Sequence, residues 1–208
     1  MPRTERPAMT PKGGKSSQKI LESAFKCIAL RGCNNVTLRE IADEAGVALS
    51  QLHYYYKNKD GLFNEVLKGM RERYSDGLGA KLSKSATRAE KIRDIIDYNR
   101  ELLRNQTDLY RNFLEFFNLA MRSDEFGCDV NQFIDDIAAA ISVHLSADLA
   151  DAATSRRSEN DALARMILAS SFGIAMQYLL NRESADILAG FDILAASLNP
   201  ARRYPEPA

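Results

Sequence analysis

Apolar residues recur along most of this chain at the three-to-four-residue spacing of a buried helix face. The first such segment runs from Ser16 to Gly32, and longer ones follow at 88–105, 108–121, 129–150, 160–181 and 185–198. No segment shows the convincing alternation of apolar and polar residues that a half-buried strand needs. With the shorter segments between residues 37 and 70, these patterns predict an all-α fold of about nine helices.

A second, short helix is predicted to begin after Thr37. Thr37 and Glu40 have the spacing of a capping box, in which each side chain accepts a hydrogen bond from the other residue's backbone N–H. Val36 and Ile41 can form the hydrophobic staple that often accompanies such a start. Gly46 is a typical helix stop, so this helix should be only about ten residues long.

A third helix is expected over Leu49–Tyr55, followed by a longer one for which Asn58 is the predicted N-cap. Two short helices joined by a glycine turn are the arrangement in which one helix braces on the DNA backbone and the next enters the major groove. The third segment carries hydrogen-bonding and aromatic side chains, as groove reading requires: Ser50, Gln51, His53, Tyr54 and Tyr55. Alternatively, the tyrosines at 54–56 are core or rim aromatics, although consecutive residues cannot all share one face.

Charge is distributed unevenly although the whole chain is neutral. Residues 1–75 hold 13 Lys and Arg against 8 Asp and Glu, a net charge of +5, and the remainder carries −5. Only the N-terminal third therefore suits a polyanion, although such an excess also occurs on ordinary solvated faces. Residues 1–15 read as a flexible basic arm that either touches a minor groove or is a solvated tail, its cations being Arg3, Arg6, Lys12 and Lys15.

The stretch from Thr37 to Val47, followed by that from Leu52 to Phe63, closely resembles the DNA-binding domain of the TetR (tetracycline repressor) family. The resemblance covers roughly residues 16–70. It implies a helix-turn-helix domain at 16–62 after the arm, and a helical effector-binding and dimerisation domain at 63–208. It also implies the DNA contacts Thr37, Arg39, Leu49, Ser50, Gln51, His53, Tyr54, Tyr55 and Lys59.

The sequence departs from the family pattern at several of these positions. Ala48 stands where a capping Ser or Thr is usual, which should weaken the third helix by roughly 1 kcal/mol. Ser50 replaces a usual Gly or Ala, His53 a frequent Tyr, and Tyr56 a usual Phe. The residues typical of the family therefore do not identify the operator sequence of this protein.

The C-terminal body concentrates bulky side chains that the resemblance would place around an effector cavity, with ordinary core packing as the alternative. The candidate effector residues are Tyr98, Phe113, Phe116, Phe117, Met121, Phe133 and Tyr178. The last two helical segments are apolar or small around most of their surface and should supply half of a four-helix homodimer interface, or else form an internal hairpin. The candidate interface residues are Met166, Ser170, Gly173, Ile174, Gln177, Ile187, Phe191 and Leu194.

These features predict a ligand-responsive repressor that binds a palindromic operator in double-stranded DNA as a homodimer. The rival hypotheses are an enzyme with its site in the body and a helical protein-interaction adaptor. No catalytic motif supports an enzyme, and no cofactor is expected. Cys27, Cys33 and Cys128 form no CxxC pair, and His144 lacks acidic neighbours at ligand spacing, so we expect neither disulfides nor a metal site. Without a signal peptide or membrane span in the sequence, we expect a cytoplasmic protein.

Overall fold

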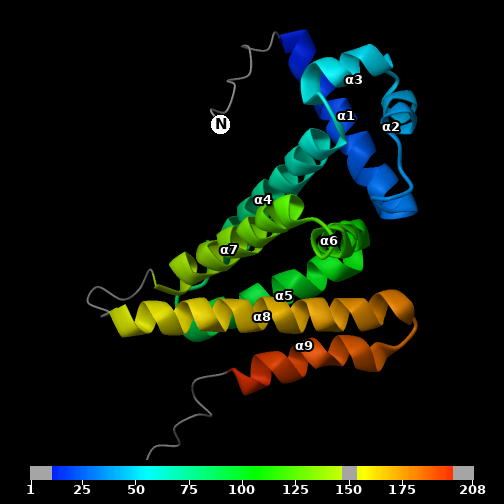
Figure 1. The fold of residues 1–208 in the computed structure, drawn as a ribbon. Coiled ribbons are helices and arrows are strands. Elements are labelled where there is room, and N and C mark those ends of the chain that lie inside the picture. The colour runs from blue at the N-terminus through cyan, green and yellow to red at the C-terminus, as the bar shows by residue number, and fades with distance from the viewer. Residues whose placement is uncertain (1–10, 147–153, 199–208) are drawn as a thin grey trace, which may run out of the picture. The chain divides into compact units, whose positions relative to one another are not determined.

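The computed structural model describes residues 11–146 and 154–198, and these ranges contain nine helices and no strand. This confirms the predicted all-α class. In chain order (Figure 1), the helices are α1 (Pro11–Arg31), α2 (Leu38–Ala45), α3 (Leu49–Tyr56), α4 (Lys59–Leu82), α5 (Arg88–Asn105), α6 (Thr107–Ala120), α7 (Asp124–Ser146), α8 (Thr154–Leu180) and α9 (Ala185–Ser197).

Two helices begin earlier than the sequence pattern predicts. Helix α1 starts at Pro11, inside the segment expected to be an arm, and residues 1–10 lie outside the described residues. Helix α7 starts at Asp124 instead of 129, because the Ser123 hydroxyl accepts the Phe126 N–H at 3.4 Å. A side-chain oxygen that receives an early backbone N–H allows a helix to begin upstream of its apolar stripe.

The chain divides into two compact units. The first unit extends to Gly69 and includes Arg111–Val130, whereas the second comprises Met70–Tyr110 and the chain from Asn131 onward. The first unit is therefore larger than the segment 16–62 predicted for a helix-turn-helix domain. Aromatic packing accounts for the addition, since the ring of Phe116 in α6 lies 5.7 Å from that of Phe63 in α4 and 5.6 Å from that of Phe126 in α7.

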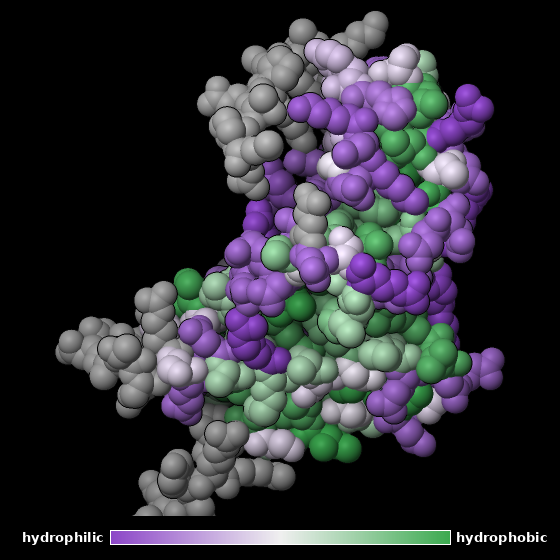
Figure 2. Space-filling view, viewed as in Figure 1, coloured by the Kyte–Doolittle hydropathy of each residue, from purple (hydrophilic) through white to green (hydrophobic). Residues whose placement is uncertain are grey.

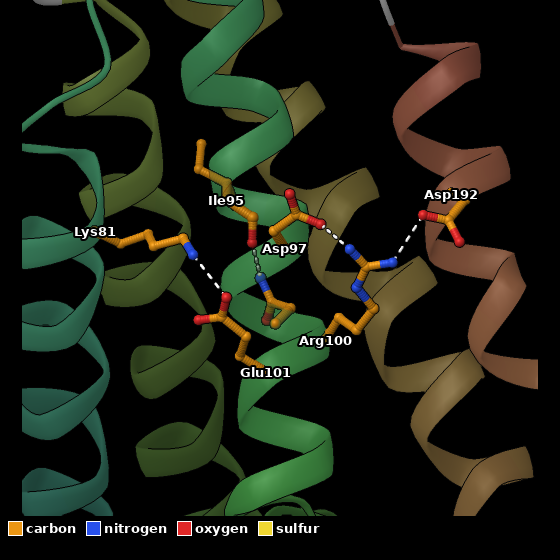
Figure 3. A network of polar contacts seen from close by, with 7 residues as sticks. Lys81, Ile95, Asp97, Arg100, Glu101 and Asp192 are labelled. Carbon is orange, nitrogen blue, oxygen red and sulfur yellow. Dashed lines mark hydrogen bonds and ion pairs between the residues drawn. The ribbon is translucent and has the colours of Figure 1, made fainter.

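In the second unit, α5 packs against α8 and α9. Its polar side chains reach in two directions (Figure 3): Glu101 accepts a hydrogen bond from the Lys81 ammonium of α4 at 2.7 Å, and Arg100 pairs with Asp97 and with Asp192 of α9. Asn99 is buried on the same helix and donates to the Ile95 carbonyl at 2.8 Å and to the Tyr74 hydroxyl at 3.2 Å. These contacts hold α5, α9 and the part of α4 from Met70 onward in the second unit.

Helix α8 is apolar well beyond what its own unit buries. Its segment Ser158–Leu180 has a mean hydropathy of 1.4 over its most apolar window, of which 28% is buried, and by length and composition it could cross a membrane. Cores of soluble proteins also contain such helices, so one of them is weak evidence for a span. Figure 2 shows hydrophobic residues at the surface along α8 and α9, where the exposed large side chains include Met166, Met176, Leu180 and Ile193.

Candidate DNA-binding site

Helix α2 has the start and the stop that the sequence predicts. The Thr37 hydroxyl accepts the Glu40 N–H at 3.2 Å, and the Glu40 carboxylate accepts the Thr37 N–H at 2.8 Å. These hydrogen bonds from Thr37, together with the nearby Arg31 guanidinium, lower the pKa of Glu40. Gly46 ends the helix at a φ of 65°, a left-handed conformation that glycine adopts without strain. Thr37 and Arg39 are both exposed at the start of this helix.

Helix α3 has one buried and one open face. Leu52 and Tyr56, four residues apart, are 0% and 4% exposed, so they anchor the helix in the first unit. The Tyr56 hydroxyl also donates to the Ser17 carbonyl of α1 at 3.0 Å. The predicted reading residues are on the remaining surface: Ser50, His53 and Tyr54 are exposed, and Leu49, Gln51 and Tyr55 are partly buried.

The prediction that the three consecutive tyrosines cannot all share one helix face is confirmed. Tyr56 is buried, whereas Tyr54 is 71% exposed, and the Tyr55 ring stands edge-on to Tyr54 with centroids 5.3 Å apart. As predicted, Ala48 gives α3 no side-chain cap. Tyr54 is therefore a large aromatic surface beside the polar groups of α3.

The connection from α3 to α4 is a tight turn through Lys57. Lys57 has a φ of 58° and a ψ of −56°, and is the one non-glycine residue with positive φ in the described ranges. The turn closes with the Asn58 N–H donating to the Tyr56 carbonyl at 2.6 Å. Asn58 then caps α4, as predicted, by accepting the Gly61 N–H at 2.8 Å. Lys59 begins α4 and its ammonium lies 5.4 Å from the centroid of the Phe63 ring.

Helix α6 contributes two side chains to this unit that the sequence analysis does not anticipate. The Glu115 carboxylate accepts the Cys33 N–H at 2.9 Å, just after the end of α1, and Asn112 donates to the Phe25 carbonyl at 2.9 Å. Burial and the adjacent Glu115 carboxylate raise the pKa of the Cys33 thiol to about 12. No local motif could reveal contacts between residues 82 and 87 positions apart.

The structure divides the candidate effector residues between the two units. Phe113, Phe116, Phe117 and Met121 belong to the first unit, in which Phe116 is completely buried and Phe117 and Met121 are 45% and 75% exposed. Tyr98, Phe133 and Tyr178 belong to the second. There the Tyr98 hydroxyl donates to the Tyr74 carbonyl at 3.1 Å, and burial raises the pKa of Tyr98 to about 12.

The candidate interface residues on α8 and α9 differ in exposure. Met166 and Gln177 are exposed, and Ser170, Gly173, Ile174, Ile187 and Leu194 are partly buried. Phe191, by contrast, is 1% exposed and is a core residue of the second unit. Ile174 contacts α9 within the chain, because a Cβ at Gly190 would lie 3.3 Å from its terminal methyl carbon.

Comparison with known proteins identifies the helix-turn-helix. Residues 20–66 match the family model for bacterial regulatory proteins of the tetR family, a range that spans α1 to the first turns of α4. These residues form a DNA-binding domain of the tetR family. The matched range includes α3 and the helices packed around it, so the exposed face of α3 lies within this domain.

Relatives of known name cover part of this chain. The regulator BetI of Brucella anthropi is 27% identical over 108 residues, which are 52% of this chain and 56% of that protein. The chain thus aligns with about half the length of the curated relatives it matches.

Solved structures share the fold across nearly the whole chain. FadR of Bacillus subtilis, a transcriptional regulator solved with stearoyl-CoA, is 19% identical with a TM-score of 0.67 and covers 88% of this chain and 97% of its own. A protein from Saccharomonospora viridis, described as a transcriptional regulator and solved with choline, is 20% identical with a TM-score of 0.65, covering 92% and 97%. At these identities the likeness shows the fold alone.

Proposed function

We propose that this protein is a cytoplasmic transcriptional regulator that binds double-stranded DNA through α2 and α3 and does not act as an enzyme. One observation carries the proposal: α3 is anchored by Leu52 and Tyr56, yet leaves polar and aromatic side chains on an open face within a TetR-family domain. An anchored short helix with such a face suits the major groove, where donors and acceptors of the base edges are read.

Each proposed contact residue has a role that fits its chemistry. Thr37, Arg39 and Lys59 position the protein on the phosphates, because hydroxyls, cations and helix N-termini supply most backbone contacts. Leu49, Ser50, Gln51 and His53 face the base edges, while Tyr54 and Tyr55 contact the flanking phosphates through their hydroxyls.

We further propose that the body responds to a small-molecule effector. Two proteins of this fold, FadR and the Saccharomonospora viridis protein, were solved with stearoyl-CoA and choline. An effector that binds better to a state poorly suited to the operator lowers the affinity for DNA, so the protein acts as a ligand-responsive repressor. The effector candidates in the second unit are Tyr98, Phe133 and Tyr178, and those in the first are Phe113, Phe116, Phe117 and Met121.

The functional protein is proposed to be a homodimer formed by α8 and α9. The apolar surface left open on α8 supports this proposal, since a face of this kind requires a partner. Met166, Ser170 and Gly173 follow one another at spacings of four and three, so they share one side of α8. Small residues on that side allow close approach of a second copy, and a two-fold dimer would present two reading helices to a palindromic operator.

Binding to DNA is tested by fluorescence anisotropy with duplexes from the intergenic region next to the gene, over a series of salt concentrations. We expect a complex whose affinity falls steeply with salt, as counterion release dictates. The double variant Arg39→Ala, Tyr54→Ala should bind at least about tenfold more weakly. Arg104→Ala, which removes an exposed arginine of α5, is the matched control and should bind like the wild type. Equal affinity of the double variant and the wild type would refute the contact assignment.

A further inference from the structure

His53 is the one reading residue of α3 whose ring is tied to the protein's own backbone. Its Nδ1 lies 3.0 Å from the carbonyl oxygen of Lys57, and the Lys57 N–H returns a hydrogen bond to the His53 carbonyl at 2.9 Å. A carbonyl oxygen only accepts hydrogen bonds, so Nδ1 must carry the hydrogen. In the neutral ring the other nitrogen, Nε2, is therefore an acceptor and not a donor.

The turn after α3 keeps the accepting carbonyl in place. Lys57 has the backbone conformation of a γ-turn with a positive φ, which is rare for a residue with a side chain. Hydrogen bonds of the neighbouring residues hold this turn in place. The Asn58 N–H closes the turn onto Tyr56, and the Asn58 side chain caps α4. A Cβ at Gly61 would meet the Tyr56 carbonyl at 2.6 Å, so this close approach of the two helices requires glycine.

Nε2 has no hydrogen-bond partner among the described residues. His53 is exposed, and the exposed Ser50 lies three positions earlier on the same helix face. The chemistry of Nε2 restricts what it can bind on DNA. Phosphate oxygens offer no hydrogen, so a neutral His53 in this tautomer cannot form a hydrogen bond with the backbone. In the major groove, the donors are the amino groups N6 of adenine and N4 of cytosine.

We infer that His53 is a specificity-determining residue that selects an amino base, adenine or cytosine, over a keto base, guanine or thymine, at one position of one strand in each half-site. The O6 of guanine and the O4 of thymine are acceptors, so they cannot form a hydrogen bond with the unprotonated Nε2. The inference rests on the proposed DNA binding and adds to it the type of base that this side chain reads.

The tautomer is tested without DNA, on the full-length protein labelled with ¹⁵N in its two histidines, His53 and His144. At pH 8, long-range ¹H–¹⁵N correlation spectra should show His53 with a protonated Nδ1 and an unprotonated Nε2. His144→Gln assigns the signals, since it leaves His53 alone in the spectrum. A His53 ring protonated on Nε2 would overturn the inference whatever the protein does with DNA.

Base selection is tested by enriching a randomised duplex pool at pH 8 with the wild type and two variants. We expect the wild type to prefer adenine or cytosine roughly tenfold over guanine or thymine at one position per half-site. His53→Phe should lose that preference at similar affinity for the other positions. His53→Lys, which offers only donors, should reverse it toward keto bases. Melting curves establish that both variants are folded.

The outcomes separate the inference from the proposed function. Wild-type protein that ignores DNA at low salt would overturn both. Sequence-selective binding with the same preferred base in His53→Phe would overturn the role of His53 while leaving DNA binding intact. An imidazolium signal from His53 in the complex at pH 8 would also overturn it, since a doubly protonated ring donates to phosphate instead of accepting from a base.

Discussion

The three cysteines occupy environments that should make their reactivities differ sharply. Cys27 and Cys33 are buried, and burial raises the pKa of both thiols, for Cys33 to about 12. Cys128 is exposed on α7. Because the thiolate is the reactive form, we expect one thiol per chain to react quickly with a disulfide reagent in the native protein and three in denaturant. Cys128→Ser should abolish the fast phase; a fast phase that persists in this variant would contradict the burial of the other two.

Also at the residue scale, two glycines differ in backbone conformation and in the space around a Cβ, so their substitution by alanine should change the free energy of unfolding differently. Gly32 has a φ of 82°, and a Cβ there would lie 2.8 Å from the Glu115 carboxylate that receives the Cys33 N–H. Gly32→Ala should therefore cost more than the roughly 1–2 kcal/mol of a left-handed alanine. Gly69→Ala, inside α4 with open space around its Cβ, should instead stabilise by about 1 kcal/mol. Urea unfolding measures both changes, and a cost for Gly32→Ala no larger than that of the left-handed conformation alone would refute the contact with Glu115.

At the scale of a helix, α3 lacks the cap that α2 has. Ala48 is in the extended conformation of an N-cap residue, but it has no oxygen to accept a backbone N–H. Ala48→Ser should supply that acceptor and stabilise the protein by about 1 kcal/mol, whereas Thr37→Ala should destabilise it by a similar amount. Denaturant midpoints measure these changes. No gain from serine would show that the start of α3 is satisfied in another way.

The capping boxes of α2 and α5 also predict how stability depends on pH. Hydrogen bonds from the Thr37 and Thr87 backbones lower the pKa values of Glu40 and Glu90 from the ordinary 4.5. Their contribution is thus complete above pH 4.5 and disappears as the pH falls through the lowered values. Glu40→Gln with Glu90→Gln should weaken the loss of stability on acidification in that window. An unchanged acid profile in urea titrations would contradict these caps.

How far the sequence predicts the structure depends on how local the interactions are. The capping box of Thr37, the stop at Gly46 and the Asn58 cap each lie within a few residues, so the short helices and the face of α3 could be anticipated. The contact of Glu115 with Cys33 joins α6 to the end of α1 across 82 positions, and no periodicity reports it. For the same reason Phe116 reads as a cavity candidate in the sequence but fills the core of the first unit.

At the scale of the whole molecule, the exposed apolar surface of α8 is the feature that best supports the proposed contact with a second copy of the chain. Gly173 offers a clean test, since nothing lies within 4 Å of a Cβ built on it, and so a side chain can be added without disturbing its own subunit. Gly173→Glu would place a charge in the proposed interface, where an unpaired carboxylate costs about 3–5 kcal/mol. By light scattering after gel filtration, we expect a dimer for the wild type and a monomer for Gly173→Glu.

The matched control for this variant is Gly79→Glu, a glycine of α4 with equally open space around its Cβ. It adds the same charge to a helix and should leave the dimer intact. Because a palindromic operator is held by two reading helices at once, Gly173→Glu should also lose most of its affinity for the full operator while keeping that for a half-site. A dimeric Gly173→Glu would exclude this side of α8 as the interface. A wild-type monomer that binds lipid vesicles would instead assign the apolar surface to a membrane.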